Sequence, residues 1–304
     1  MRRRRRAQVA AGSVVGGVVL AVVAMAIGTG ALTGGGRVAG ADESAPYYLA
    51  IGGSESVGVQ PDAVDRRGAP TDEGYADDLT RSEAARWPGL QLVELGCPGE
   101  TASAALDGGG ACHYDAGSQV GEALAFLHAH PGAAVLATVD LGFNDLRPCL
   151  ADRAVDEHCV TTALAEVGQT VTTIVDELES AGGPSLEVVG IEKYDPYLGA
   201  YTAGPDGQTF AEATLPVFGE LNATLVKAYA GAGATVADVP GAFDTADQQP
   251  TTLAGYGTVP TDVARVCTLT WACADSPFPH NVHPNADGYQ VVADAVAATL
   301  DRPG

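Results

Sequence analysis

Basic side chains are scarce in this sequence of 304 residues. It contains 16 lysine and arginine residues against 38 acidic ones, and its formal net charge is −22. Six of the arginines precede residue 42, so residues 42–304 have 10 basic and 38 acidic side chains and a net charge of −28. A chain this acidic repels phosphate backbones and anionic lipid surfaces. We therefore exclude nucleic acid as a partner.

Charged residues are absent from positions 7–36, and five consecutive arginines precede this stretch. A positive start followed by an apolar run rich in Val, Ala and Gly is typical of a secretory signal peptide. Residues 39–41 read Ala-Gly-Ala, which fits a cleavage site and would make Asp42 the first residue of the mature protein. The alternative is an uncleaved membrane anchor, because the run is long enough to span a bilayer. Either way, residues 1–41 direct export of a domain over 42–304.

Cysteine pairs of the CxxC type, which many zinc sites use, are also absent. An even number of cysteines instead fits disulfides in an oxidising compartment. Six cysteines allow fifteen connectivities, and pairing of sequence neighbours is the simplest. It would join Cys97 to Cys112, Cys149 to Cys159 and Cys267 to Cys273.

The composition is otherwise that of a chain able to bury a large core, with 46% apolar and 18% charged residues. Short apolar runs alternate with helical patterns, which predicts a parallel sheet covered by helices on both faces. No pattern marks a domain boundary after residue 45. The predicted strands are 47–52, 90–95, 133–140, 186–192 and 234–239, and the predicted helices are 119–130, 160–180, 216–230 and 287–300. Stretches rich in Gly, Asp and Pro at 57–80, 103–118, 194–212 and 241–280 are predicted to be loops.

Four candidate site residues stand where the predicted strands end or the last helix begins. Ser54 follows two glycines after the first strand, Gly99 follows the second strand and Asn144 the third. His283 stands before the last helix and is a natural general base, because its side chain titrates near neutral pH. Ligands of open parallel sheets bind at the carboxyl ends of the strands. Each signal alone is common in turns, but together they predict one site.

The order of these residues resembles the SGNH, or GDSL, hydrolases over residues 45–300. The Gly-Cys-Pro-Gly-Glu-Thr run and the cysteine pairs resemble the secreted actinobacterial esterases and lipases of that family. The resemblance implies a flavodoxin-like, three-layer α/β/α sandwich with a central parallel sheet of five strands. It also implies Ser54 as the nucleophile and His283 as its base, with no metal or organic cofactor. The oxyanion hole would consist of the backbone N–H groups of Ser54 and Gly99 and the side-chain amide of Asn144.

Three positions depart from the family pattern. Gly53 stands where the family usually has Asp, and Glu55 where it has Leu. The pattern Asp-x-x-His would place an aspartate at 280, where this chain has His280. The ring of His283 could be oriented by Asp275 or by a main-chain carbonyl near residue 280, the latter leaving a Ser-His dyad. The third alternative is a decayed site that binds a ligand without catalysis.

We expect a secreted serine hydrolase that cleaves lipid or short-to-medium acyl esters through an acyl-enzyme. Glu192 ends the predicted fourth strand, and Asp195 and Tyr197 follow it. All three could line the substrate cleft, although loop structure explains them equally well. The alternatives are a deacetylase or acyltransferase acting on cell-envelope carbohydrates, and the ligand-binding protein named above. The ester substrate is the expected partner of a monomer that contacts a membrane only if its N-terminal segment stays attached.

Overall fold

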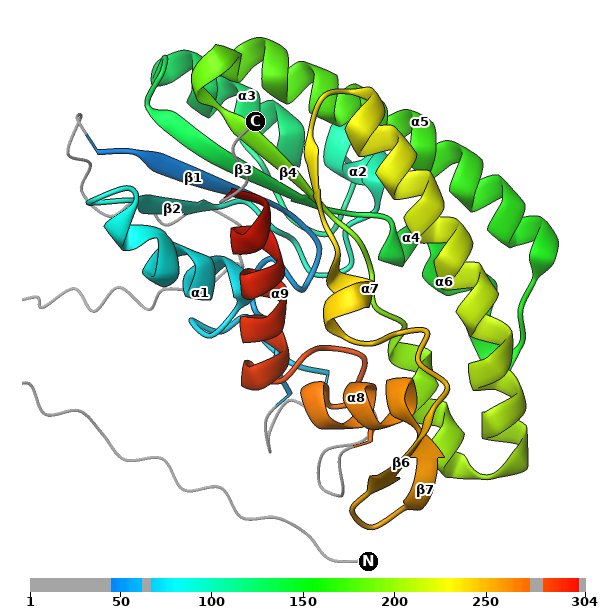
Figure 1. Cartoon of the computed structure of the whole chain (residues 1–304). Helices are drawn as coiled ribbons and strands as arrows, with labels where there is room; N and C mark the ends of the chain where they lie inside the picture. The colour runs from blue at the N-terminus through cyan, green and yellow to red at the C-terminus, as the bar shows by residue number, and fades with distance from the viewer. Residues whose placement is uncertain (1–44, 62–66, 274–280, 301–304) are drawn as a thin grey trace, which may run out of the picture. The chain divides into compact units, whose positions relative to one another are not determined.

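Five short apolar segments form a parallel sheet, as the sequence predicts (Figure 1). The computed structural model describes residues 45–61, 67–273 and 281–300, so the predicted signal segment and Asp42 lie outside the described residues. The strand order is β2-β1-β3-β4-β5, and every neighbouring pair is parallel. The strands are β1 Tyr47–Gly52, β2 Gln91–Glu94, β3 Ala134–Asp140, β4 Glu187–Ile191 and β5 Thr235–Ala237.

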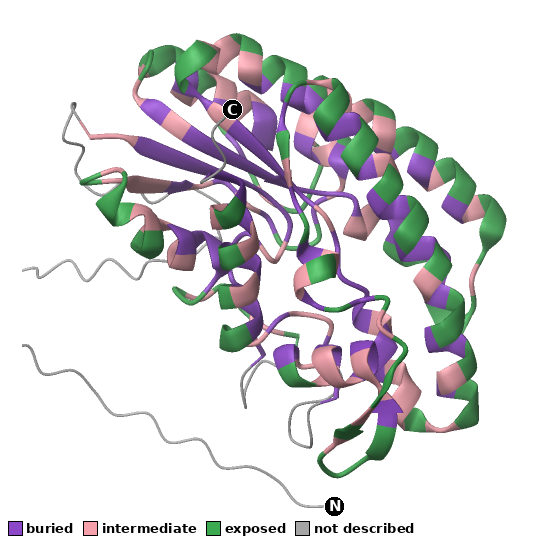
Figure 2. Ribbon diagram, in the orientation of Figure 1, coloured by how far each residue is buried: buried purple, intermediate pink, exposed green. Residues whose placement is uncertain are grey.

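Helices cover both faces of this sheet, which confirms the three layers. Side chains alternate along β1, so that Tyr47, Leu49 and Ile51 pack into one apolar cluster while Tyr48 and Ala50 pack into the other. Because both faces are covered, the central strands are buried along almost their whole length (Figure 2). The first cluster contains residues of α2 Ala102–Asp107, α3 Gln119–Ala129, α5 Glu157–Gly182 and α6 Pro205–Gly231; the second contains residues of α1 Tyr75–Ser82, α8 Thr261–Leu269 and α9 Ala286–Leu300.

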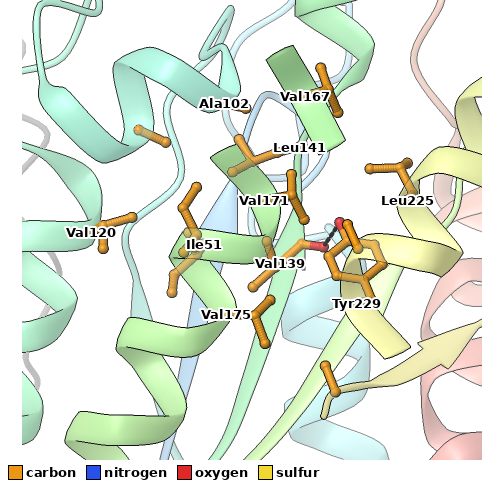
Figure 3. Packing of buried hydrophobic residues seen from close by; sticks show 14 of the residues in the cluster. Ile51, Ala102, Val120, Val139, Leu141, Val167, Val171, Val175, Leu225 and Tyr229 are labelled. Atoms are coloured by element: carbon orange, nitrogen blue, oxygen red, sulfur yellow. Dashed lines mark hydrogen bonds between the residues drawn. The ribbon is translucent and has the colours of Figure 1, made fainter. Parts of the chain in front are cut away.

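The first cluster fixes α5 and α6 against the end of the sheet where the site lies. Val171 and Val175 of α5 pack among Ile51 and Val139 of the two central strands (Figure 3). The buried hydroxyl of Tyr229 on α6 donates to the main-chain oxygen of Val139 at 2.9 Å. This bond satisfies the tyrosine's polar end inside the core and ties α6 to the last residues of β3.

Two helices are longer than the sequence pattern predicts. Helix α5 begins three residues earlier, because the Asp156 side chain accepts the amides of His158 and Cys159 as an N-cap. Helix α6 begins at Pro205, although the sequence predicts a loop up to residue 212 and a helix from 216, and it continues through Pro216. Proline leaves the carbonyl of Glu212 without its helical donor. Glu212 and Pro216 are both exposed, so water can take that place.

The predicted loops contain several regular elements, so that part of the prediction is wrong. Short helices escape a prediction based on composition because a few capping and apolar residues suffice to form them. Thr101, for instance, caps α2 by accepting the amide of Ala104. The remaining elements are the hairpin of β6 Pro250–Leu253 and β7 Gly257–Pro260, the short helices α4 Phe143–Leu146 and α7 Val239–Ala242, and the 3-10 segments η1 Glu83–Ala85, η2 Arg147–Arg153, η3 Gly183–Ser185 and η4 Pro196–Ala203.

The structure confirms the predicted pairing of sequence neighbours by disulfides. The bonds join Cys97 to Cys112, Cys149 to Cys159 and Cys267 to Cys273, with separations of 15, 10 and 6 residues. The first pair closes the loop after β2, and the third closes the segment after α8. In the described ranges, no helix has the length and apolar character to cross a membrane.

Candidate active site

Ser54 follows β1 at the sheet edge where the carboxyl ends of the strands meet. The turn before it is fixed to the neighbouring strand, because the Gly53 amide donates to the main-chain oxygen of Asp140 at 3.2 Å. The side-chain oxygen of Ser54 lies 2.8 Å from Nε2 of His283. The two residues are 229 positions apart in the sequence. The structure therefore brings the predicted nucleophile and the predicted base into hydrogen-bond contact.

Main-chain bonds to the segment after α8 hold the loop that carries His283. The Trp271 amide donates to the His283 oxygen at 3.0 Å, and the Asn281 amide donates to the Trp271 oxygen at 3.2 Å. The Cys267–Cys273 disulfide closes around this segment. The histidine is therefore positioned by a segment that a disulfide closes and by the start of α9, three residues further on.

Asn281 supplies the hydrogen-bond partner of the second ring nitrogen of His283. Its Oδ1 lies 2.5 Å from Nδ1 of the histidine and 3.0 Å from the histidine's main-chain nitrogen. A main-chain N–H can only donate, so the amide atom facing it is the oxygen. That oxygen can only accept, so Nδ1 bears the proton of the neutral ring. Nε2 then presents its lone pair to Ser54.

Sequence reasoning does not identify Asn281 as this partner. A signal is present, because asparagine side chains often bond the main chain two residues further on, and Asn281 and His283 have that spacing. The partners that the sequence suggests are Asp275 and a carbonyl near His280. Both residues lie outside the described ranges, so these two alternatives stay predictions.

Two of the predicted oxyanion-hole residues lie next to each other beyond β2 and β3. Nδ2 of Asn144, in α4, donates to the main-chain oxygen of Glu100 at 3.0 Å. Gly99 precedes Glu100 with a φ of +87°, a left-handed conformation that favours glycine. A Cβ added to Gly53 would lie 3.0 Å from the Asn144 nitrogen. The glycine that replaces the family's aspartate thus leaves room for this amide.

Buried polar side chains link the loops that carry these groups. Both carboxylate oxygens of Asp145, the residue after Asn144, accept the Ala102 amide at 3.0 and 3.1 Å. The Gln119 amide nitrogen donates to the main-chain oxygens of Gly52 at 2.9 Å and Leu95 at 3.0 Å. The ends of β1 and β2 are therefore joined by one side chain, and the loop after β2 is joined to α4 by another.

The electrostatic surroundings keep His283 neutral. Burial lowers the pKa of this imidazole to about 4, while the nearby charge of Glu55 raises it and that of Arg147 lowers it. At neutral pH the ring can therefore accept a proton. The same burial makes the protonated ring costly, so a negative charge close to it would assist any reaction that passes through that form.

Lys193, a residue that sequence reasoning did not select, lies beside the serine. Its ammonium pairs with the Glu55 carboxylate at 3.3 Å and with that of Asp140. Glu55, which departs from the family pattern, is therefore one partner of a buried lysine. A small cavity is lined by these three residues together with Ser54, Asn144 and His283.

A mostly apolar groove of about 330 Å³ begins beside Asn281. This volume is within the usual range of small-molecule sites, roughly 300–1,000 Å³. The groove shares Val282, the residue before His283, with the small cavity at the serine. Its apolar walls include Leu150, Pro196, Tyr197, Ala200, Phe210 and Val282, and Asp152 and Arg153 line it as well.

The three residues predicted to line a cleft after the fourth strand have three different positions. Tyr197 lines the groove just described, as expected. Glu192 lines a separate groove formed with α6 and α7, away from the serine. Asp195 is fully buried and accepts the Thr214 hydroxyl at 2.6 Å and the Tyr197 amide at 2.9 Å, so its contacts serve the fold.

Comparisons with known proteins identify the family and the fold. The sequence model of the GDSL-like Lipase/Acylhydrolase family matches residues 50–291. An extracellular lipase from Streptomyces rimosus has a similar structure, with a TM-score of 0.55 and 19% identity over 84% of this chain and 99% of that one. Phospholipase A1 from Streptomyces albidoflavus NA297 gives a TM-score of 0.50 and 18% identity over 84% and 99% of the two chains. A search of curated protein sequences finds no match.

Proposed function

This chain belongs to the GDSL-like lipase/acylhydrolase family and is an ester hydrolase, and on that premise we propose that it is a secreted serine esterase that forms an acyl-enzyme on Ser54. The 2.8 Å contact between Ser54 and Nε2 of His283 is the observation that carries the proposal. It also favours catalysis over the alternative of a site that only binds a ligand.

Acylation begins with proton transfer from Ser54 to His283. The serine oxygen attacks the ester carbonyl carbon while its proton moves to Nε2, which the Asn281 contact keeps unprotonated in the resting enzyme. The carbonyl oxygen becomes an oxyanion. His283 then gives the proton to the leaving alcohol, and the bond between the carbonyl carbon and the alcohol oxygen breaks. Water hydrolyses the acyl-serine by the same steps.

The oxyanion would be stabilised by the backbone N–H groups of Ser54 and Gly99 and by the amide of Asn144. One N–H of that amide donates to the main-chain oxygen of Glu100, and its second N–H can donate to the oxyanion. The links through Asp145 and Gln119 support this role, because donors held in place before the reaction stabilise charge without reorganising. Removing one such donor typically costs about 3 kcal/mol of transition-state stabilisation.

The apolar groove beside Asn281 would hold the acyl chain. Its volume and apolar walls favour a medium-length acyl group over a bare acetate, because buried methylene groups contribute about 0.8 kcal/mol each. This observation favours a lipid or medium-chain ester over an acetylated carbohydrate. The strong negative charge of the chain favours a neutral substrate.

Export of the protein is part of the proposal. Three disulfides fit an oxidising compartment, and the arginine-led apolar segment of residues 1–41 fits a cleaved signal peptide. Mass spectrometry of the protein recovered from the culture medium should give an N-terminus at Asp42. Retention of residues 1–41 in the membrane fraction would favour the anchor instead.

The function is tested by hydrolysis of p-nitrophenyl acetate, butyrate and octanoate. We expect turnover by the wild-type protein, and loss of roughly a thousandfold or more in kcat for Ser54→Ala or His283→Ala, because each removes a group that acts in both chemical steps. Circular dichroism should be unchanged in both variants. Equal turnover by wild type and Ser54→Ala would overturn the assignment.

The acyl groove is tested by narrowing it with Ala200→Phe. Octanoate hydrolysis should fall about tenfold or more relative to acetate hydrolysis, because the new ring occupies space that the longer chain needs. Ala223→Phe is the matched control, since Ala223 lines a different surface groove between α5 and α6. An unchanged octanoate-to-acetate ratio in Ala200→Phe would place the acyl chain elsewhere.

A further inference from the structure

Three charged side chains lie together in the small cavity that Ser54 also lines. The Lys193 ammonium contacts the carboxylates of Glu55, at 3.3 Å, and of Asp140. The side chains are 4%, 14% and 1% exposed for Lys193, Glu55 and Asp140. Burial lowers the pKa of Lys193, while the neighbouring Glu55 raises it. With the lysine protonated and both acids ionised, this ion cluster has one excess negative charge.

The fold holds each member of the ion cluster in place. Glu55 directly follows Ser54, and Asp140 ends β3 with its main-chain oxygen bonded to the Gly53 amide. The main chain of Lys193 is held by both ends of the Asn222 amide, with distances of 2.7 and 2.8 Å. The lysine side chain therefore extends from a rigid strand end toward the serine.

Stability alone gives little reason for such a cluster. Buried ion pairs can be replaced by apolar residues of similar size with little or no loss of stability, because their desolvation is costly. The family pattern has an apolar leucine at the position of Glu55. A charged cluster at this point in the chain therefore suggests a role in the chemistry next to it.

The partner of His283 on its other side lacks a charge. Asn281 offers an amide oxygen, which orients the ring but carries no negative charge to balance a protonated imidazole. The ion cluster and His283 line the same small cavity. The negative charge of Glu55 favours the protonated form of the His283 ring, and the positive charge of Arg147 disfavours it.

We infer that the ion cluster of Glu55, Lys193 and Asp140 supplies the negative charge that stabilises protonated His283 during acyl transfer, in place of the carboxylate that the family pattern puts next to the histidine. Two tasks that one aspartate performs in the family pattern are then divided. Asn281 orients the ring, and Glu55 and Asp140 provide charge while Lys193 holds them together. Glu55 acts through the field at His283 and is a positioning residue. The inference rests on the proposed function.

Other titratable groups face this site and bear on its pH dependence. Glu100 follows β2 and is buried in the same cavity, Arg147 lies in η2 near the ring, and the hydroxyls of Tyr75, Tyr194 and Tyr289 lie within the field of Glu55. Burial raises the pKa of all three hydroxyls well above the ordinary value, so they stay neutral when His283 titrates. Burial also raises the pKa of Glu100. Among the described residues that line the cavity, Glu100 is the one acid outside the ion cluster, so the test needs a control variant at this position.

The test follows the rate at which a fluorophosphonate probe labels Ser54 between about pH 2.5 and pH 8, a range that brackets the titration of His283. This rate needs the serine and a neutral His283 but no particular ester. Glu55→Gln keeps the shape of the side chain and removes its charge. We expect the plateau rate to fall on the order of tenfold or more, and the midpoint of the acid limb to move to lower pH, because the pKa of His283 loses the charge that raises it.

Conservative and remote variants separate this role from a structural one. Glu55→Asp should recover most of the rate and the midpoint, because the charge is restored. Glu192→Gln and Glu100→Gln are the matched controls. Glu192 lies in another groove, and the charges that act on the His283 ring are those of Glu55 and Arg147 and not that of Glu100. Both variants should therefore keep the wild-type midpoint. In an Asn281→Asp background a carboxylate already faces the ring. Glu55→Gln should therefore reduce the labelling rate clearly less in that background than in the wild type.

The outcomes are distinct. The inference would be overturned if Glu55→Gln lowered the labelling rate but left the midpoint of the acid limb unmoved. It would also be overturned if Glu55→Gln reduced the labelling rate equally in the wild type and in the Asn281→Asp background. In either case wild-type labelling and ester turnover would leave the proposed function standing. If the wild type neither labels at Ser54 nor hydrolyses esters, the proposed function fails and the inference fails with it.

Discussion

At the scale of single residues, His283 stands between a serine and a neutral amide. Oδ1 of Asn281 accepts both the main-chain N–H and the ring N–H of the histidine. The two bonds fix the tautomer and the ring plane together. Asparagine orients the histidine in Cys-His-Asn proteases in a related way, so an uncharged acceptor is compatible with nucleophilic catalysis.

Substitution of Asn281 should therefore affect catalysis more than stability. Asn281→Ala removes the acceptor on Nδ1, and we expect kcat for p-nitrophenyl butyrate to fall about a hundredfold or more, because the wrong tautomer becomes populated. Asn281→Asp keeps an acceptor and adds a charge, so it should retain turnover and raise the pKa of His283 above about 4. The acid limb of the pH profile of kcat/KM should then move to higher pH. Wild-type kinetics in Asn281→Ala would show that this bond does not orient the base.

At the scale of elements, the site depends on how three strand ends are joined. The loop after β2 contains Gly99, and α4 after β3 contains Asn144, so the two donors lie on different segments. The Asp145 carboxylate connects these segments by accepting the first amide of α2 through both oxygens. The disulfide of Cys97 closes the same loop from its other side.

The effect of Asp145→Ala tests whether this connection positions the oxyanion hole. We expect kcat to fall about tenfold with little change in KM, because the donors act mainly in the transition state. Loss of the bond to Ala102 should also reduce the free energy of unfolding by about 1 kcal/mol, measured by urea denaturation. Asp145→Asn keeps one acceptor oxygen, so both kcat and the free energy of unfolding should fall less than in Asp145→Ala. A fall in stability with kcat unchanged would limit Asp145 to a structural role.

At the scale of the whole molecule, buried acids affect how stability depends on pH. Burial raises the pKa of Asp195 and of Glu192 to about 7, and that of Asp262 to about 6. Each acid ionises more readily in the unfolded chain than in the folded one. The folded state therefore loses stability as pH rises from the ordinary pKa of a carboxyl group to its value in the folded protein.

Asp195→Asn isolates one of these acids. At about pH 8, ionisation of this fully buried carboxyl should lower the free energy of unfolding of the wild type by on the order of 4 kcal/mol. At about pH 4 the effect should be small. Asparagine cannot ionise and can still accept the Tyr197 amide. The difference in unfolding free energy between the variant and the wild type should therefore rise in favour of the variant as the pH is raised across this range. A difference that is constant with pH would contradict an elevated pKa for Asp195.

Much of this protein is determined by patterns that are local in sequence. Short apolar runs predict the five strands. The prediction succeeds because strands of a parallel sheet are covered on both faces and so consist almost entirely of apolar residues. Ser54, Gly99, Asn144 and His283 stand in an order that identifies the family, which the match over residues 50–291 confirms. The cysteine pairs are sequence neighbours, so their pairing could also be predicted.

Short elements were less predictable, because a few capping contacts decide them. Helices α1 and α2 and the β6–β7 hairpin lie in stretches whose Gly, Asp and Pro content predicts loops. The start of α6 was missed because residues 205–212 belong to a stretch whose Gly, Asp and Pro content predicts a loop, with the helix beginning at Pro216. Glu212 and Pro216 are both exposed, so water can replace the helical donor that the proline lacks.

The surroundings of the base were decided by tertiary structure alone. Lys193 has no distinguishing pattern around it, and its partner Glu55 is 138 residues away. The parallel sheet brings the ends of β1, β3 and β4 to one edge, and there two carboxylates and one ammonium meet out of water. The sequence by itself thus determined which residues could react, whereas the tertiary structure decided their charges and orientation, because electrostatic interactions depend on distance and burial and not on position along the chain.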